Sequence, residues 1–355
     1  MKCNKKKIFG ELFSYFICLI IMWYIAETLL NSKEIIHSVH QSIIRCISVL
    51  IPSLFGLMVI SDLIIRTGIY QKISILFYPI SRFIFRLPYP LFFVFLLGNI
   101  AGYPIGIKLL TQLVEKNSID KKTAERMSLF CFNSGPAFVI GTVGIAIFSS
   151  VKIGLIIYMS CLIANIICGI ICGLVSKYTY NHEDTKVTLS AENLVLSVQS
   201  SGKSMLMVCL MVVFSSKTIR LLDCVHIFAG LSEKTEILVF SLLEITNITT
   251  LTSSYKLIPV ITFLVGFGGI CVLLQLTAIC KNKFSILKFV LIRIPISLLA
   301  SIISYLFIIY LPIAEYCMEN YYYTDKSSNT NVFSIICLIC MIIIIFFRKK
   351  TSNSD

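Results

Sequence analysis

Two clusters of glycine, proline and small polar residues interrupt long apolar runs in the first half of the chain, where they could bind a ligand. The first is GNIAGYPIGIK, residues 98–108, and the second is NSGP, residues 133–136. Proline lacks a backbone donor and restricts the residue before it, and glycine permits left-handed backbone, so both clusters predict broken helices. Broken backbone at membrane depth is tolerated where it lines a cavity or is covered by protein, and broken helices commonly line substrate sites in transporters.

A second pair of breaks follows in the second half of the chain, at EITN, residues 244–247, and GFGG, residues 266–269. Glu244 lies in the apolar stretch SLLEITNITTLTSS, and an ionisable group at such a depth is a functional hypothesis by default. It could accept a proton, bind a cation or contact a ligand donor. The alternative is a carboxylate near the outer surface that pairs with Lys234 or Lys256.

The candidate substrate-binding residues all lie at these four breaks or close beside them. They are Asn99, Gly102, Tyr103, Pro104, Gly106, Lys108, Asn133, Ser134, Gly135, Pro136, Glu244, Asn247, Gly268, Gly269 and Gln275. The structural alternatives are tight packing between helices for the cluster at 98–106, internal capping of the break for 133–136, and snorkelling to the cytoplasmic interface for Lys108, where snorkelling is the simpler interpretation. Asp62 and Arg66, one helical turn apart, are most simply an interfacial ion pair.

The composition indicates an all-α membrane protein with several spanning helices. Of the 355 residues, 57% are hydrophobic and only 14% are charged, and the mean hydropathy is +0.89. Several segments exceed the roughly 18 apolar residues that cross a bilayer as a helix. The net charge of +13 lies at the ends of apolar segments, which favours cytoplasmic flanks over nucleic-acid binding. We expect no metal, no cofactor and no enzymatic activity, because no catalytic or metal-binding motif is present.

The positive-inside rule predicts a topology with both termini in the cytoplasm. Basic stretches flank the apolar segment 87–107 on both sides, which predicts a re-entrant hairpin that turns at GNIAGYPIG. The other predicted segments are 8–30, 41–65, 127–148, 153–175, 194–216, a second hairpin at 236–253, then 257–280, 294–312 and 332–347. Most Lys and Arg residues then lie inside, including Arg293 in an inner loop before the segment 294–312.

The two halves of the chain repeat the same order of elements, which predicts two inverted repeats. SVHQSIIRCISVLIPSLF in the first half aligns with SVQSSGKSMLMVCLMVVF in the second, each followed by a hairpin, a broken helix and a plain helix. Inverted repeats with broken helices recur in secondary transporters. We therefore predict an anchor helix at 1–37, a first repeat at 38–175, a second repeat at 194–312, and an outer loop, last helix and basic tail at 313–355.

PSLFGLMVISDLIIRTG, GNIAGYPIGIKLL and ERMSLFCFNSGPAFVIGTVGIAIF together resemble the YlbJ family of sporulation integral membrane proteins. GFGGICVLLQ fits the second half of that family. The resemblance covers about residues 40–312 and implies a nucleoside-recognition or Gate domain, similar to the nucleoside-transporter fold, and a role in spore cortex formation. It carries over the GYPIGIK and NSGP residues as motifs, without a known ligand.

These observations predict a multi-pass protein of the cell membrane that acts in sporulation and moves an unknown small solute. The alternative is a non-transporting scaffold that positions cortex-assembly proteins. The expected partners are the lipid bilayer and the solute, with a homo-oligomer or other sporulation membrane proteins as further candidates.

Overall fold

The computed structural model describes residues 2–181, 187, 190–225, 228, 230–251, 254–280, 283 and 285–311, with side chains from residue 11 onward. Across these ranges the regular secondary structure is helical, without a strand. Six helical segments are long and apolar enough to span a membrane: Glu11–Leu30, Ser32–Arg66, Val151–Val175, Ala191–Cys224, Tyr255–Cys280 and Ile286–Tyr310. The all-α, multi-pass class is thereby confirmed. The predicted helix at 332–347, with the loop before it and the tail after it, lies outside the described residues.

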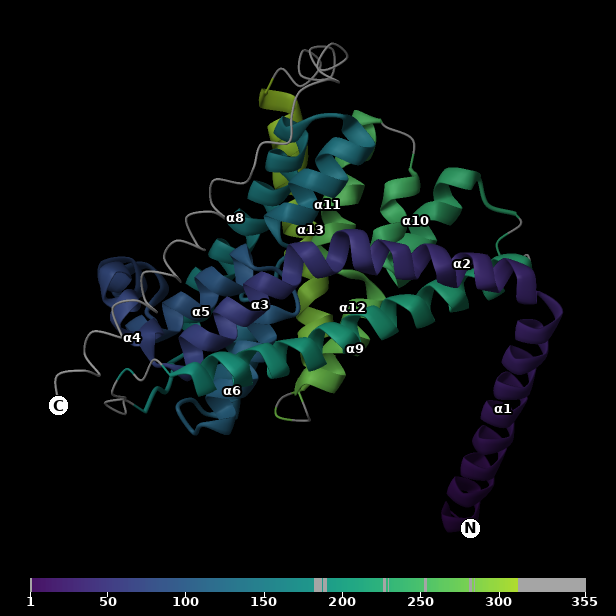
Figure 1. Ribbon diagram of the computed structural model, residues 1–355, viewed down its shortest axis with the longest axis horizontal. Helices are drawn as coiled ribbons and strands as arrows, with labels where there is room; N and C mark the ends of the chain where they lie inside the picture. Colours follow the sequence, from purple (N-terminus) through teal and green to yellow (C-terminus); the bar gives the residue numbers. More distant parts are fainter. Residues whose placement is uncertain are drawn as a thin grey trace.

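The first helix, α1 (Lys2–Leu30), projects away from the rest of the molecule (Figure 1). The next segment is one long helix made of α2 (Ser32–Arg45), a π-helical turn at Cys46–Leu50 and α3 (Ile51–Arg66). The wide turn precedes Pro52, which cannot donate to the helical ladder. The Ser53 hydroxyl donates to the Val49 carbonyl at 2.7 Å, one turn earlier in the same segment. At 35 residues this segment measures about 50 Å, longer than a bilayer core requires.

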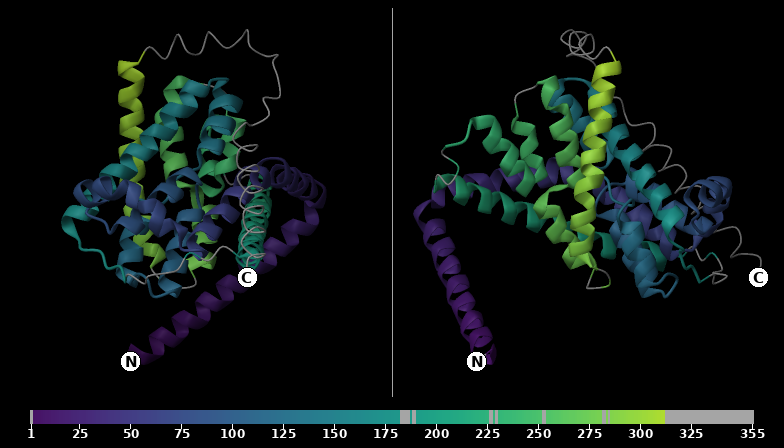
Figure 2. Two further views of the ribbon diagram at one scale, coloured as in Figure 1. Left: turned by 60° about the vertical axis from the view of Figure 1, so that its left-hand side comes forward. Right: turned by 180° about the vertical axis from the view of Figure 1, so that it is seen from behind.

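Helix α9 (Ala191–Cys224) runs alongside α2 and α3 across the molecule, at a large angle to α8 and α13 (Figures 1 and 2). It continues eight residues beyond the predicted end at 216. Lys217 and Arg220, which we expected in an outer loop, therefore lie in the helix. Arg220 forms ion pairs with Glu34 and Asp223 there, so tertiary pairing extends the helix past its apolar stretch.

The first predicted hairpin is present, with a longer return helix than expected. After α4 (Ile69–Ser74), a 3-10 turn (Ile75–Phe77) and a π-helical segment (Ile80–Phe85), helix α5 (Tyr89–Ile100) leads into the turn and α6 (Ile105–Glu115) leads back. We predicted its end at 107, because Lys108 resembles the start of a basic flank. Lys108 instead lies inside α6 and is buried.

The NSGP segment separates α7 (Lys121–Ser128) from the π-helical segment η4 (Ala137–Ile147), which leads to α8 (Val151–Val175). The second half begins with α10 (Glu233–Leu243) and the 3-10 segments η5 (Ile245–Thr250) and η6 (Tyr255–Leu257). Helices α11 (Ile258–Phe267) and α12 (Gly269–Cys280) are separated at Gly268 and Gly269, both with positive φ. Helix α13 (Ile286–Tyr310) follows. All four predicted breaks are confirmed.

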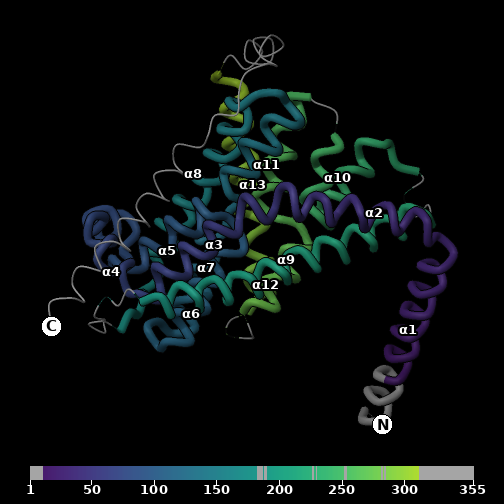
Figure 3. The backbone as a smooth tube through the Cα atoms, viewed as in Figure 1, coloured from purple at the N-terminus to yellow at the C-terminus, as the bar shows by residue number. Residues whose placement is uncertain are grey.

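Elements that the predicted repeats would make equivalent pack against each other: α3 on α9, and α8 on α13. In the tube trace of Figure 3, α11, α12 and α13 lie near the centre, with α4 to α7 on the left and α10 on the right. The inversion of the two repeats stays a prediction.

Glycine at position 106 is required because the first hairpin packs closely on the backbone at Cys131 and on its own first helix. A Cβ atom at Gly106 would lie 1.9 Å from the Cys131 carbonyl oxygen and 2.9 Å from the Gly98 Cα. We expect Gly106→Ala to lower stability by about 1–3 kcal/mol, because backbone on both sides must move. Gly56→Ala is the matched control, since nothing lies within 4 Å of its Cβ position. Thermal unfolding in detergent measures the stability of the purified wild type and of both variants. Equal unfolding midpoints for Gly106→Ala and Gly56→Ala would contradict the packing argument.

Candidate functional site

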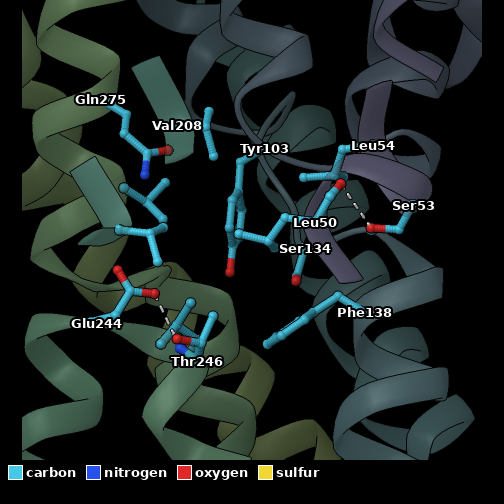
Figure 4. Close-up of a pocket in the computed structure, with 14 residues that line it drawn as sticks. Leu50, Ser53, Leu54, Tyr103, Ser134, Phe138, Val208, Glu244, Thr246 and Gln275 are labelled. Carbon is cyan, nitrogen blue, oxygen red and sulfur yellow. Dashed lines mark hydrogen bonds between the residues drawn. The ribbon is translucent and has the colours of Figure 1, made fainter. Parts of the chain in front are cut away.

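A small pocket lies where the hairpin tips and breaks of both halves meet the long helices (Figure 4). It has a volume of about 50 Å³, room for a few water molecules. Helices α3, α9 and α12 supply its apolar wall. Its lining comprises Leu50, Ser53, Leu54, Tyr103, Ser134, Gly135, Phe138, Val208, Val212, Glu244, Ile245, Thr246, Val272 and Gln275. A solute larger than a few waters requires the pocket to widen.

Glu244 carries the only formal charge among the residues that line this pocket. It sits in extended backbone where α10 ends, and its side chain is 1% exposed. Its Oε1 accepts a hydrogen bond from the Thr246 amide at 3.2 Å. Neither its Oε2 nor the Thr246 hydroxyl has a hydrogen-bond partner among the described residues. The second half thus presents an unfilled acceptor and an unfilled hydroxyl at one wall of the pocket.

Tyr103 and Ser134 bring the two breaks of the first half to the opposite wall. The Tyr103 amide donates to the Asn133 carbonyl at 2.7 Å, and its ring stacks on Phe132 with centroids 5.0 Å apart. Gly102 allows this contact, because a Cβ there would lie 2.6 Å from the Gly135 nitrogen. Figure 4 shows the Tyr103 hydroxyl, the Ser134 hydroxyl and the Glu244 carboxylate directed into one space.

Of the fifteen predicted site residues, the structure brings Tyr103, Ser134, Gly135, Glu244 and Gln275 to this pocket. Others shape the backbone around it. Asn247 donates to the Glu244 carbonyl at 3.1 Å and closes the second turn. Asn133 accepts from the Ser134 amide at 2.9 Å, while its Nδ2 is buried without an acceptor in the part of the chain described.

The remaining predicted residues lie outside the pocket lining, at turns and helix contacts. Gly106, Gly268 and Gly269 permit close packing or left-handed backbone. Pro104 and Pro136 precede α6 and η4, respectively. For these residues the packing alternative describes the observed geometry better than direct contact with a solute.

Asn99 belongs to a buried polar network that stabilises the breaks. Its Nδ2 donates to the carbonyls of Phe95 and Phe130 at 2.9 and 3.1 Å, and its Oδ1 accepts from Asn165 at 2.8 Å. The Asn165 Nδ2 also donates to the Phe132 carbonyl at 3.0 Å. Asn99 therefore bonds backbone carbonyls of two segments and serves packing between them, which is the structural alternative for its cluster.

Arg293 completes this network, and its predicted place in an inner loop is wrong. Helix α13 begins at Ile286, so Arg293 lies inside it, with a fully buried side chain. Its guanidinium donates to the Gly266 carbonyl at 2.7 Å, the Leu129 carbonyl at 3.2 Å and the Asn165 Oδ1 at 2.8 Å. Gly266 and Leu129 lie at the carboxyl ends of α11 and α7, where free carbonyls and the helix dipole favour a cation.

Lys108 forms a second buried cluster, so the snorkelling interpretation is wrong. Its Nζ lies 3.1 Å from Asp62 Oδ1 and donates to the Ser201 hydroxyl at 3.2 Å. Asp62 is fully buried and also accepts hydrogen bonds from Arg66, Gln112 and Ser200. The predicted Asp62–Arg66 pair is present, as part of an interior network that joins α3, α6 and α9.

Sequence reasoning missed several lining residues, chiefly Ser53 and the apolar residues of α3, α9 and α12. Ser53 follows Pro52 within an apolar run, and a polar residue beside a helix-breaking proline is the sequence feature that could have indicated its place in the lining. The apolar lining residues carry no such signal, because any face of a membrane helix has the same composition.

Comparison with known proteins gives one informative match. The chain is 26% identical over 325 residues to the sporulation integral membrane protein YlbJ of Bacillus subtilis (strain 168), covering 80% of this chain and 79% of that protein. No family model matches the chain, and no solved structure matches it. The nucleoside-recognition assignment therefore has no support from these comparisons. The similarity covers most of both chains and confirms the resemblance to YlbJ that the sequence motifs indicate.

Proposed function

We propose that this sporulation membrane protein transports a small solute through the pocket between the two hairpin tips, in support of spore cortex formation. The observation that carries the proposal is the buried Glu244 carboxylate, with Oε2 free to accept a hydrogen bond. A buried carboxylate without a full set of partners destabilises the protein, and an ionisable group at membrane depth favours a role in binding.

The two walls of the pocket come from different halves of the chain. Tyr103 and Ser134 belong to the first predicted repeat, and Glu244 and Thr246 belong to the second. Movement of one hairpin against the other would change the width of the pocket, as alternating access requires. The solute would carry a hydrogen-bond donor for Glu244 and an apolar body for the wall of α3, α9 and α12. The proposal assigns no enzymatic step to these residues.

A Glu244→Gln substitution in sporulating cells, at equal protein level, tests the proposal. Glutamine keeps the shape of the side chain and removes the charge and one acceptor. We expect a small molecule to accumulate on one side of the membrane, detected by untargeted metabolite profiling, together with at least a tenfold loss of heat-resistant spores.

Glu233→Gln is the matched control, because Glu233 is exposed and lies in the first turn of α10, the helix that ends at Glu244. The metabolite profile and the yield of heat-resistant spores of this control variant should equal those of the wild type. Normal spores and unchanged metabolites in Glu244→Gln would contradict transport through this pocket, and the scaffold alternative would then explain the sporulation role better.

A further inference from the structure

A second and larger pocket lies beside the first, lined mainly by α6 and α9, with Arg66 from the end of α3 and two residues of α12. Its volume is about 540 Å³. Its lining comprises Arg66, Lys108, Thr111, Gln112, Glu115, Lys116, Leu196, Gln199, Ser200, Lys203, Ser204, Met207, Ala278 and Ile279. On α9 it ends at Met207, next to Val208 of the small pocket, and on α12 it begins one turn after Gln275. By the predicted topology it faces the cytoplasm.

The charges around this second pocket do not balance. Three cations, Arg66, Lys108 and Lys203, line it above the buried Asp62 carboxylate, while Lys116 and Glu115 also line it and have interactions of their own. Asp62 is shared by two of these cations, since both Arg66 and Lys108 contact it. The Lys108 side chain is only 7% exposed. One buried carboxylate thus faces two cations at the floor, and the exposed Lys203 adds a third, so the pocket carries an excess of positive charge.

Hydrogen-bonding groups at the floor add a second requirement to the ligand. The Gln112 Nε2 donates a hydrogen bond to Asp62, which fixes the orientation of the side chain. The Gln112 Oε1 is buried and receives no hydrogen bond from the described residues. A ligand that fits the floor supplies negative charge to the cations and one donor to the Gln112 oxygen.

We propose that this pocket is a binding site for a small oxyanion, a phosphate or phosphate monoester that carries at least one hydroxyl donor. The volume admits a group much larger than inorganic phosphate. Ordinary cytoplasmic flanking lysines extend into water, whereas Lys108 lies inside the protein, paired with a carboxylate and a serine hydroxyl. The inference is independent of transport through the small pocket, because equilibrium binding requires no passage of solute.

Lys203 gives the cleanest test of this site. It is exposed, lies on α9 at the mouth of the pocket, and makes no hydrogen bond to Asp62. The full chain, wild type or Lys203→Gln, is placed in nanodiscs of phosphatidylcholine, and thermal unfolding is followed in potassium phosphate and in potassium chloride of equal ionic strength. We expect phosphate to raise the wild-type midpoint by about 3 °C when its concentration is about a hundred times the Kd. Lys203→Gln should lose most of that rise, and Lys203→Arg should keep it.

Lys122→Gln is the matched control, an exposed lysine on α7 that does not line the pocket. It should show the full phosphate effect, which separates specific binding from the general action of phosphate on protein surfaces. A third preparation with phosphatidylglycerol in the nanodisc and no free phosphate separates the two sources of the anion. A Lys203-dependent rise in that preparation alone would assign the site to a lipid headgroup phosphate and support the oxyanion chemistry.

Two results would overturn the inference. One is the absence of any midpoint rise with either phosphate source. The other is an equal rise in wild type, Lys203→Gln and Lys122→Gln. Neither result bears on Glu244, so failure here is distinguishable from failure of the proposed transport.

Discussion

Replacing Arg293 with methionine is expected to remove at least about 3 kcal/mol of stability, because three buried acceptors lose their donor at once. These acceptors are the carbonyls of Gly266 and Leu129 and the Oδ1 of Asn165. Methionine fills a similar volume, so the loss reports hydrogen bonding more than cavity formation. The guanidinium also lies over the Phe132 ring, 4.9 Å from its centroid, and this contact disappears too.

The comparison of Arg293→Lys with Arg293→Met separates charge from geometry. Lysine keeps the positive charge at the two helix ends, yet it cannot reach three acceptors in different directions as a planar guanidinium does. We expect its stability to lie between that of wild type and Arg293→Met. Arg82→Met is the control, since Arg82 is exposed, and it should change the midpoint little. Thermal unfolding in one detergent measures all four proteins. Equal midpoints for Arg293→Met and Arg82→Met would show that the breaks are stable without the arginine.

The breaks themselves could be read from the sequence because their causes are local. Gly268 and Gly269 adopt positive φ, and Pro136 cannot donate to a helix, whichever elements surround them. The same local rules located Glu244 at a hairpin tip, where the structure places it in a pocket wall.

The groups that stabilise the breaks could not be found this way. Arg293 lies 27 residues after the Gly266 carbonyl and 164 residues after the Leu129 carbonyl to which it donates. A basic residue near the end of an apolar run looks like a membrane flank. For the same reason the sequence predicts that Lys108 snorkels to the interface, whereas the structure buries it in α6. Only the packed structure shows that these cations turn inward, because their partners come from helices distant in sequence.

Replacing Asp62 with asparagine is expected to lower stability by about 3–5 kcal/mol, since it leaves Lys108 charged in the interior without its counter-ion. Asp62 is fully buried and receives contacts from Arg66 on its own helix, from Lys108 and Gln112 on α6, and from Ser200 on α9. Asparagine offers one acceptor in place of a shared charge. The NH₂ group of asparagine also points its hydrogens at neighbouring groups that can only donate hydrogen bonds and so cannot accept them.

The double variant Asp62→Asn, Lys108→Met decides whether unpaired charge causes this loss. Removing the lysine as well takes away the buried cation, so the double variant should be more stable than Asp62→Asn alone by about 1–3 kcal/mol. Asp223→Asn is the matched control, because Asp223 also pairs with an arginine but is 33% exposed, and such pairs contribute about 1 kcal/mol or less. Thermal midpoints of the wild type, Asp62→Asn, Lys108→Met and the double variant close the cycle, and Asp223→Asn is measured beside them. A double variant that loses the sum of both single effects would mean that Asp62 and Lys108 act separately, and the buried pair would then be a contact without energetic coupling between α3 and α6.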